Sequence, residues 1–173
     1  MEDRNLIHDI IFDFEINASV SDVWKAWTTE RGIRSFFSPD CRVDFKVDGR
    51  FEILFDTSAP EGLQGSEGMK ILAMERERMF SFTWNAPPDN PAIRSQRTFV
   101  NVHLFALSGT RTRLLFRNIG YGQGDEWRRA LQYFKNAWGN VVLPRLVYYL
   151  ENGQYDWENP PDLSDYRLYR AER

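Results

Sequence analysis

The fold is decided by residues 125–150, which read DEWRRALQYFKNAWGNVVLPRLVYYL. Large apolar residues recur in this stretch at spacings of three and four, the period that places side chains on one stripe of an α-helix. The stripe comprises Trp127, Leu131, Phe134, Trp138, Val141, Val142, Leu146 and Tyr149. Because a helix with so much apolar surface needs a broad partner, we expect the rest of the chain to supply one.

Two residues interrupt this predicted helix. Inside a helix, glycine costs roughly 1 kcal/mol relative to alanine and proline about 3 kcal/mol. Gly139 and Pro144 therefore predict a bend between Trp138 and Leu146. The bend has two interpretations: it lets the helix follow a curved sheet, or it opens a cavity beneath itself. We expect the helix and its partner to separate here and leave room for a ligand. Asp125 is the expected N-cap.

Upstream segments in which apolar and polar residues alternate predict the partner surface, since a period of two is typical of half-buried strands. The first strand covers residues 8–16. Asp48-Gly49, a dipeptide suited to a type I′ turn, is expected to join the first of three hairpins. The hairpins pair residues 41–47 with 50–55, 67–74 with 79–84, and 98–107 with 112–119. They predict a curved antiparallel sheet of about six to seven strands wrapped around the helix, an α+β fold.

Two short helices are predicted directly after the first strand. Ser19 is a suitable N-cap for the first of them, and Asp22, three residues on, can return the bond. Thr28 or Thr29 is expected to cap the second helix, which contains Ile33, Phe36 and Phe37.

The remaining segments predict loops and a tail. Residues 56–65 and 85–97 are rich in glycine, proline and polar residues, so we expect long exposed loops there. Asn152-Gly153 is a typical helix stop, which makes residues 1–153 a single domain and residues 154–173 a C-terminal tail. The aromatic residues of the tail are expected either to pack on the domain or to reach a second subunit, which leaves a homodimer open.

The composition excludes several classes of function. Lys and Arg number 22 against 25 Asp and Glu, and no basic run with interleaved aromatics occurs, so neither nucleic acid nor an acidic membrane is an expected partner. A polar N-terminus and the lack of an apolar run of about 18 residues argue against a signal peptide and a membrane span. The single cysteine agrees with a reducing compartment, so we expect a cytoplasmic protein.

No self-sufficient catalytic or metal-binding motif is present. Cys41 would need a base to act as a nucleophile, and only His8 and His103 could supply an imidazole, so a buried apolar role for Cys41 is preferred. One cysteine and two distant histidines do not make a zinc site. We therefore assign no catalytic residue, no metal and no cofactor.

Residues 119–124, IGYGQG, place three glycines before the long helix. Glycine-rich loops at helix N-termini can bind phosphate. The spacing matches neither the dinucleotide fingerprint nor the P-loop, so a flexible hinge is the preferred interpretation.

Candidate binding residues are the aromatic and aliphatic groups on the strand faces and on the helix stripe. If a cavity lies between sheet and helix, its walls should come from Phe51, Phe55, Phe80, Phe82, Trp84, Val102, Phe116, Phe134 and Trp138. The alternative is that these residues fill a solid core. Polar groups that would orient a ligand are Arg50, Asn101, His103, Asn118 and Tyr133, although alternation places Asn101 and His103 on the outward face.

The order of elements resembles that of the START-like helix-grip superfamily, also called SRPBCC. Residues 18–28, ASVSDVWKAWT, residues 47–52, VDGRFE, and residues 138–146, WGNVVLPRL, resemble its branch named after the activator of the heat-shock-protein-90 ATPase. The resemblance covers roughly residues 7–150. Val20 stands where many relatives have proline, and Pro144 where they more often continue an unbroken helix. The resemblance implies a hydrophobic ligand held between helix and sheet.

Three hypotheses about function follow. The leading one is a binding module that shelters a small apolar or aromatic molecule. The second is a cyclase- or hydrolase-type enzyme on the same scaffold, which requires at least one ionisable side chain inside the cavity. The third is a chaperone-linked, stress-response interaction protein, which rests on the family name alone. The lack of an evident catalytic group favours binding over catalysis.

Overall fold

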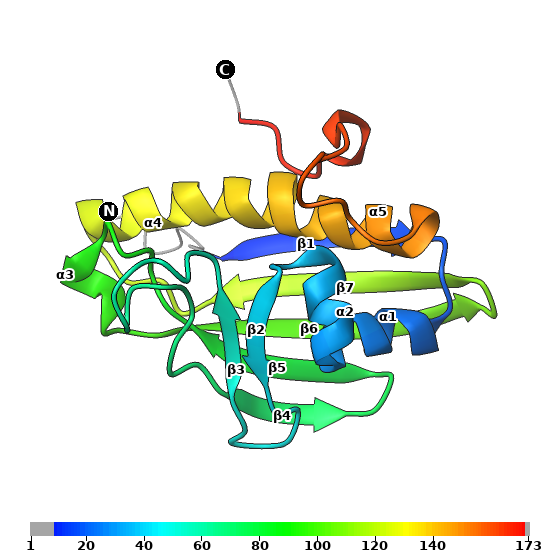
Figure 1. Ribbon diagram of the computed structural model, residues 1–173, viewed down its shortest axis with the longest axis horizontal. Coiled ribbons are helices and arrows are strands. Elements are labelled where there is room, and N and C mark those ends of the chain that lie inside the picture. The colour runs from blue at the N-terminus through cyan, green and yellow to red at the C-terminus, as the bar shows by residue number, and fades with distance from the viewer. Residues whose placement is uncertain (1–8, 172–173) are drawn as a thin grey trace, which may run out of the picture.

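The structure, a computed structural model, describes residues 9–171 and has the predicted α+β helix-grip architecture (Figure 1). Seven strands form two antiparallel sheets instead of one. The main sheet has the order β1-β7-β6-β5-β4, and the small one pairs β2 with β3. The strands are β1 (Ile10–Ile16), β2 (Asp40–Val43), β3 (Phe51–Leu54), β4 (Ile71–Glu75), β5 (Met79–Trp84), β6 (Thr98–Ser108) and β7 (Arg111–Ile119). His8, the start of the first predicted strand, lies outside the described residues.

Alternation gives the main sheet one apolar face, as predicted. Phe12 pairs with Phe116, Phe116 with Val102, and Val102 with Phe80, so these four side chains form one row across four strands. The helices and the β2–β3 pair cover this face. The opposite face carries charged residues and several exposed apolar groups, among them Ile11, Phe99, Phe105 and Leu107.

The two predicted short helices are α1 (Val20–Thr28) and α2 (Glu30–Phe36). The Asp22 backbone N–H donates to Ser19 Oγ at 3.1 Å, and the Gly32 backbone N–H donates to Thr29 Oγ1 at 3.0 Å. Both caps are those that the sequence predicts, with Thr29 the cap of α2. The buried aromatic side chains of α1 and α2 point into the interior between the sheet and the C-terminal helix.

The long C-terminal helix comprises three parts: α4 (Asp125–Asn136), a π-helical turn η1 (Ala137–Val142) and α5 (Leu143–Asn152). Gly124, and not Asp125, is the N-cap, so the helix begins one residue earlier than predicted. The predicted irregularity is present as the π-helical turn. In it the Leu143 N–H donates to the Trp138 carbonyl, five residues back, just before Pro144.

The expectation of a cavity beneath this turn is wrong. A Cβ atom on Gly139 would lie 2.5 Å from Cζ of Phe12 and 2.7 Å from Cβ of Tyr169. Trp138 is fully buried against the sheet. The missing side chain of Gly139 therefore brings helix, sheet and tail together instead of separating them.

The expected type I′ turn centred on Asp48-Gly49 is also wrong. The turn lies one residue earlier, over residues 46–49, where the Gly49 N–H donates to the Lys46 carbonyl at 2.8 Å. The Asp48 N–H donates to the Ile71 carbonyl and the Ile71 N–H donates to the Gly49 carbonyl, at 2.9 and 3.0 Å. Edge strand β4 thus bonds to the turn, and Val47 is left exposed.

The proline-rich segment 85–97 is more ordered than a simple loop. It contains a short helix, α3 (Pro91–Arg94), whose buried Ile93 joins Ala86, Trp127 and Ala130 in a small second core. Figure 1 shows α3 beside the first turns of α4. The loop is thereby attached to the helix that it faces.

The C-terminal tail packs on the same domain. It runs along the side of the long helix that faces away from the sheet (Figure 1) and includes the 3₁₀ turn η2 (Ser164–Tyr166). Tyr155 is buried, and the Leu168 N–H donates to the Gly139 carbonyl at 2.8 Å. Of the two expected roles for its aromatic residues, packing on the domain is the one observed.

Candidate functional site

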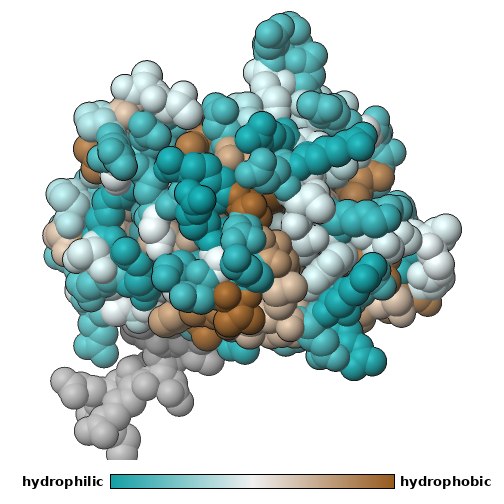
Figure 2. Space-filling model, turned by 60° about the horizontal axis from the view of Figure 1, so that its bottom comes forward, coloured by the Kyte–Doolittle hydropathy of each residue, from teal (hydrophilic) through white to brown (hydrophobic). Residues whose placement is uncertain are grey.

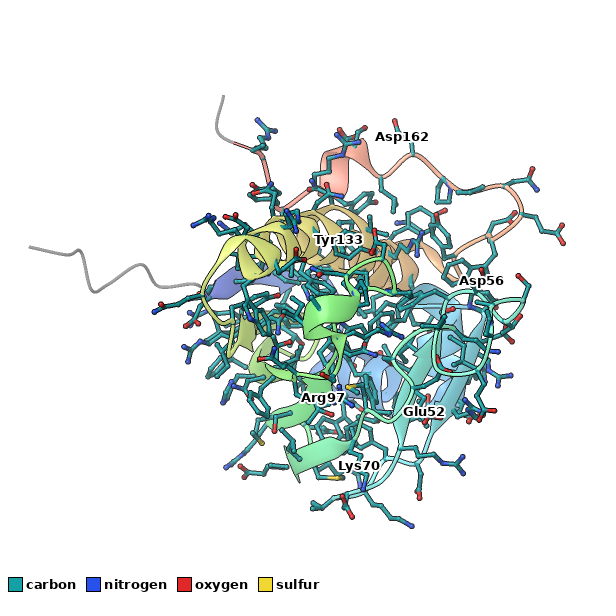
Figure 3. All side chains as sticks on the ribbon, turned by 90° about the vertical axis from the view of Figure 1, so that its left-hand side faces the viewer. Glu52, Asp56, Lys70, Arg97, Tyr133 and Asp162 are labelled. Carbon is teal, nitrogen blue, oxygen red and sulfur yellow. The ribbon has the colours of Figure 1, made fainter. Side chains whose placement is uncertain are left out.

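An apolar pocket lies beside the third turn of α4, which contributes Tyr133 and Phe134. Its volume is about 400 Å³, within the range of roughly 300–1,000 Å³ typical of small-molecule sites. The walls come from the end of β3, the end of β5, the loops 56–65 and 85–88, α3 and α4. In Figure 3, Tyr133 of α4 lies above α3, and Asp56 lies on the β3–β4 loop to its right.

Two other hollows of the described chain, each of about 440 Å³, have a different lining. Charged residues and Tyr149 with Leu150 border one of them, and the other is bordered chiefly by charged side chains such as Arg42, Glu52 and Glu67. Neither has the cluster of aromatic side chains that lines the pocket beside α4.

Three of the nine predicted binding residues line the apolar pocket: Phe55, Trp84 and Phe134. Phe55 is 54% exposed because β3 ends at Leu54, which leaves its ring at the opening. The other six lie in the core with at most 1% exposure: Phe51, Phe80, Phe82, Val102, Phe116 and Trp138. Their role in binding stays a prediction, and the structure shows them packed against other side chains.

Aromatic residues of α1 and α2 fill the centre of the interior. The Trp27 ring lies 5.3 Å from that of Phe80, and the Phe37 ring lies 5.6 Å from that of Trp138. These two side chains occupy the space between sheet and helix that was predicted to hold a ligand. The pocket therefore lies nearer the end of the sheet, where strands give way to loops.

Two charged residues hold the rim formed by residues 60–65. Glu67 accepts backbone N–H groups from Gly62, Gln64 and Gly65, the last at 2.9 Å. Arg94 donates to the carbonyls of Gly62 and Gly65 at 2.8 and 2.9 Å. Both backbone N–H groups and backbone carbonyls of the loop are thus hydrogen-bonded to side chains. The pocket wall is therefore preformed in spite of its glycine-rich sequence.

Arg94 also donates to the Ala86 carbonyl. Within residues 9–171 no carboxylate lies within 4.0 Å of its guanidinium, and burial lowers the pKa of Arg94. Trp84, 3% exposed, lines the same pocket, and its indole Nε1 has no hydrogen-bond partner in the described part of the chain. The pocket therefore combines apolar walls with one half-buried cation, on which Glu67 acts electrostatically without a direct ion pair.

The polar residues predicted to orient a ligand lie in different environments. Tyr133 lines the pocket, and Arg50 borders one of the charged hollows. Asn101 and His103 of β6 are half-buried on the outward face of the sheet. Asn118 is fully buried and binds core groups, so the structure explains it by packing and not by a ligand.

The ionisable groups of the lining are not tuned for acid–base catalysis. Hydrogen bonds from Ser58 hold the pKa of Asp56 below its usual value, and burial raises the pKa of Tyr133. Both shifts lead away from neutrality, and arginine stays protonated in proteins. Among residues 9–171, no three His, Cys, Asp or Glu side chains are grouped so that they could hold a metal ion.

Sequence reasoning missed Arg94 and the apolar residues of the two loops. Nothing in the local pattern indicates that Arg94, in a proline-flanked segment, bonds to a loop about thirty residues away. The only available signal was the presence of two long loops whose ends adjoin the aromatic ends of strands.

Comparison with known families then classifies the chain. Residues 17–151 match the family described as Activator of Hsp90 ATPase homolog 1-like protein. The chain belongs to this family. The match ends just before the tail, and it confirms the resemblance seen in the sequence. No curated protein matches the chain as a whole at a significant level.

Several solved structures share the fold at low sequence identity. The Aha1 dimer of Colwellia psychrerythraea has a TM-score of 0.65 at 17% identity, over 84% of this chain and 97% of the other. A Plasmodium falciparum protein described as an HSP90 activator has a TM-score of 0.63 at 15% identity, with 84% and 96% covered. A Mesorhizobium loti protein reaches 0.60 at 23% identity, with 83% and 93% covered. These identities show a common fold.

None of the helices in the described chain combines the length and the apolar character that crossing a membrane requires.

Proposed function

We propose that this family member binds a small apolar or aromatic molecule in the pocket beside Tyr133 and Phe134 of α4. The observation that carries the proposal is the aromatic wall formed by Phe55, Trp84 and Phe134 around about 400 Å³ of space. Those rings belong to three separate elements, so the fold assembles the pocket. The preformed rim limits the conformational entropy that a ligand would have to offset.

A binding role is supported over an enzymatic one by the lining itself. The enzyme hypothesis requires an ionisable group inside the cavity, and Asp56, Arg94 and Tyr133 meet that requirement formally. None of the three has the near-neutral pKa that a general acid or base needs. A cyclase or hydrolase therefore ranks below a binding protein.

The test uses a variant that fills the pocket. Ala59 lines the pocket at half-buried depth, so Ala59→Phe should occupy the space without disturbing the core. Ala92→Phe, on the exposed side of α3, adds the same volume elsewhere. We expect native mass spectrometry to find a retained small molecule on the wild type and on Ala92→Phe, and none on Ala59→Phe.

Titration with naphthalene covers the case of a ligand that is lost in purification. Binding to the wild type and to Ala92→Phe, with at least a tenfold loss in Ala59→Phe, supports the proposal. Equal behaviour of all three proteins in both measurements would refute it.

A second candidate function is interaction with a chaperone, together with self-association. Family membership and the description of a structural neighbour as an HSP90 activator favour it, and another neighbour is described as a dimer. On the face shown in Figure 2, apolar groups form small patches separated by polar ones. The outward sheet face, with Ile11, Phe99 and Phe105 exposed, is the broader candidate surface.

This second candidate is tested with the heat-shock-protein-90 homologue of the host. We expect the chain to change the ATPase rate of that chaperone, and Phe105→Ser to weaken the effect. An unchanged rate together with no association in a pull-down would eliminate the chaperone role. Analytical ultracentrifugation of the chain alone tests the homodimer.

A further inference from the structure

The pocket also indicates which chemical class of ligand it takes, an inference that rests on the proposed function. We propose that the ligand is a planar aromatic molecule with one carboxylate-type anionic group, and that Arg94 holds this group.

The aromatic body is inferred from the shape and chemistry of the walls. The rings of Phe55 and Trp84 lie 6.5 Å apart at an interplanar angle of 78°. Phe134 and Tyr133, whose rings meet edge to face at 5.0 Å, close the side that α4 provides. Rings in such orientations favour the edge and face contacts of a flat aromatic guest.

The anionic group is inferred from the charge of Arg94. Its guanidinium is half-buried and donates only to the neutral carbonyls of Gly62, Gly65 and Ala86. Glu67 acts on Arg94 electrostatically, but no carboxylate of the described chain lies within the 4.0 Å of a direct ion pair. A bound carboxylate would pair with the guanidinium directly, through charge-assisted hydrogen bonds.

Arg94 lies close to the end of β5. It donates to Ala86, two residues beyond Trp84, and shares the Gly65 carbonyl with the side chain of Asn85. A guanidinium has five N–H groups, so the bonds to Gly62, Gly65 and Ala86 leave N–H groups for a ligand.

The acidic residue of the lining does not favour a cationic ligand instead. Asp56 Oδ1 accepts from the backbone N–H and the hydroxyl of Ser58, at 3.0 and 2.5 Å. Asp56 is exposed at the mouth, where water screens it. The less exposed charge is that of Arg94, so the inner part of the pocket is positive.

The experiment compares three probes of one size class: 2-naphthoate, its neutral amide 2-naphthamide, and naphthalene. Affinities are measured by isothermal titration calorimetry. We expect naphthoate to bind roughly tenfold more tightly than naphthamide, and naphthamide more tightly than naphthalene. Arg94→Gln should reduce the naphthoate-to-naphthamide ratio to about one, whereas Arg76→Gln, an exposed arginine outside the pocket lining, should leave it unchanged.

A further variant separates ligand contacts from loop structure. Arg94→Lys keeps the charge, so it should retain part of the preference for naphthoate even if the rim loosens.

The outcomes distinguish the inference from the proposed function. Equal affinity of wild type for all three probes, with binding abolished by Ala59→Phe, would overturn the anionic class and leave the pocket's role intact. A preference for naphthoate that survives Arg94→Gln would also overturn it. If no probe binds the wild type, the proposed function fails first.

Discussion

Gly139 and Asn118 hold the long helix to the sheet by opposite means. Gly139 has no side chain and so allows Phe12 and Tyr169 to approach its backbone from two sides. Asn118, fully buried on β7, accepts from Trp138 Nε1 at 3.1 Å and from the Tyr121 hydroxyl at 2.6 Å. One residue permits contact by its smallness, and the other fixes orientation by hydrogen bonds.

Gly139→Ala should destabilise the protein. The added Cβ would overlap Phe12 and the tail, and such overpacking typically costs about 1–3 kcal/mol. Urea unfolding monitored by tryptophan fluorescence measures the change. Gly109→Ala is the matched control, because no atom lies within 4 Å of its added Cβ, and it should shift stability by less than about 0.5 kcal/mol. Equal effects of the two substitutions would contradict this account.

Asn118→Leu should also destabilise the protein, by about 2–4 kcal/mol. The substitution keeps an apolar volume but leaves the donors of Trp138 and Tyr121 without an acceptor, and unpaired buried groups cost roughly 1–3 kcal/mol each. Asn101→Leu, on the half-exposed outward face, is the control and should have little effect. A stable Asn118→Leu protein would show that the network is dispensable.

Among the elements, the C-terminal helix and the β1–β7 pair connect distant parts of the chain. The π-helical turn leaves the Gly139 carbonyl free, because the Leu143 N–H bonds one residue further back, to Trp138. The tail uses that carbonyl through Leu168. On the outward face of β1 and β7, Arg113 forms a two-pronged ion pair with Asp13, at 2.8 and 2.6 Å.

The Asp13–Arg113 pair predicts a pH dependence. The hydrogen bonds from Arg113 lower the pKa of Asp13 in the folded protein. The pair therefore stabilises the fold above the ordinary carboxyl pKa, and this contribution is lost as the pH falls through the lower folded value. We expect Asp13→Asn to lose less stability than the wild type between about pH 7 and pH 3.

The measurement is the urea midpoint of both proteins at the two pH values. Other carboxylates with lowered pKa, such as Asp56, are present in both proteins and cancel in the comparison. Because the pair is exposed, the difference should be small and should shrink in high salt. If the urea midpoint of Asp13→Asn fell more on acidification than that of the wild type, the proposed contribution of the ion pair would be contradicted.

At the scale of the whole molecule, the C-terminal tail contacts both α5 and α2. The guanidinium of Arg145 lies 4.9 Å from the Tyr155 ring and 5.1 Å from the Trp157 ring. The Trp157 indole donates to the Arg34 carbonyl of α2 at 3.0 Å. The tail therefore bridges α5 and α2, although it lies outside the family match.

Ending the chain at Gly153 tests the boundary between domain and tail. We expect the shortened protein to fold but to lose roughly 2–4 kcal/mol, since the buried Tyr155 and its cation–π contact disappear. Circular dichroism and urea unfolding report the two properties. A chain ended after Tyr169 keeps these contacts and should match the full protein. Failure of the Gly153 chain to fold would place the tail inside the domain.

The sequence by itself determined the elements, because their signals are local. Period-two segments predicted most of the strands, Ser19 and Thr29 predicted two caps, and the apolar stripe of residues 125–150 predicted the helix that the sheet grips. Each of these signals depends on residues a few positions apart. The fold class followed, because few arrangements cover one long apolar helix with alternating strands.

Only the tertiary structure decided where space remains inside. Trp27 and Phe37 fill the centre. Ile71 of β4 bonds to the backbone of Asp48 and Gly49. Arg94 holds the rim of the pocket through the carbonyls of Gly62 and Gly65. These outcomes depend on competition between groups far apart in the chain. A pocket is the volume left after all side chains have packed, so no local pattern in the sequence could have located it.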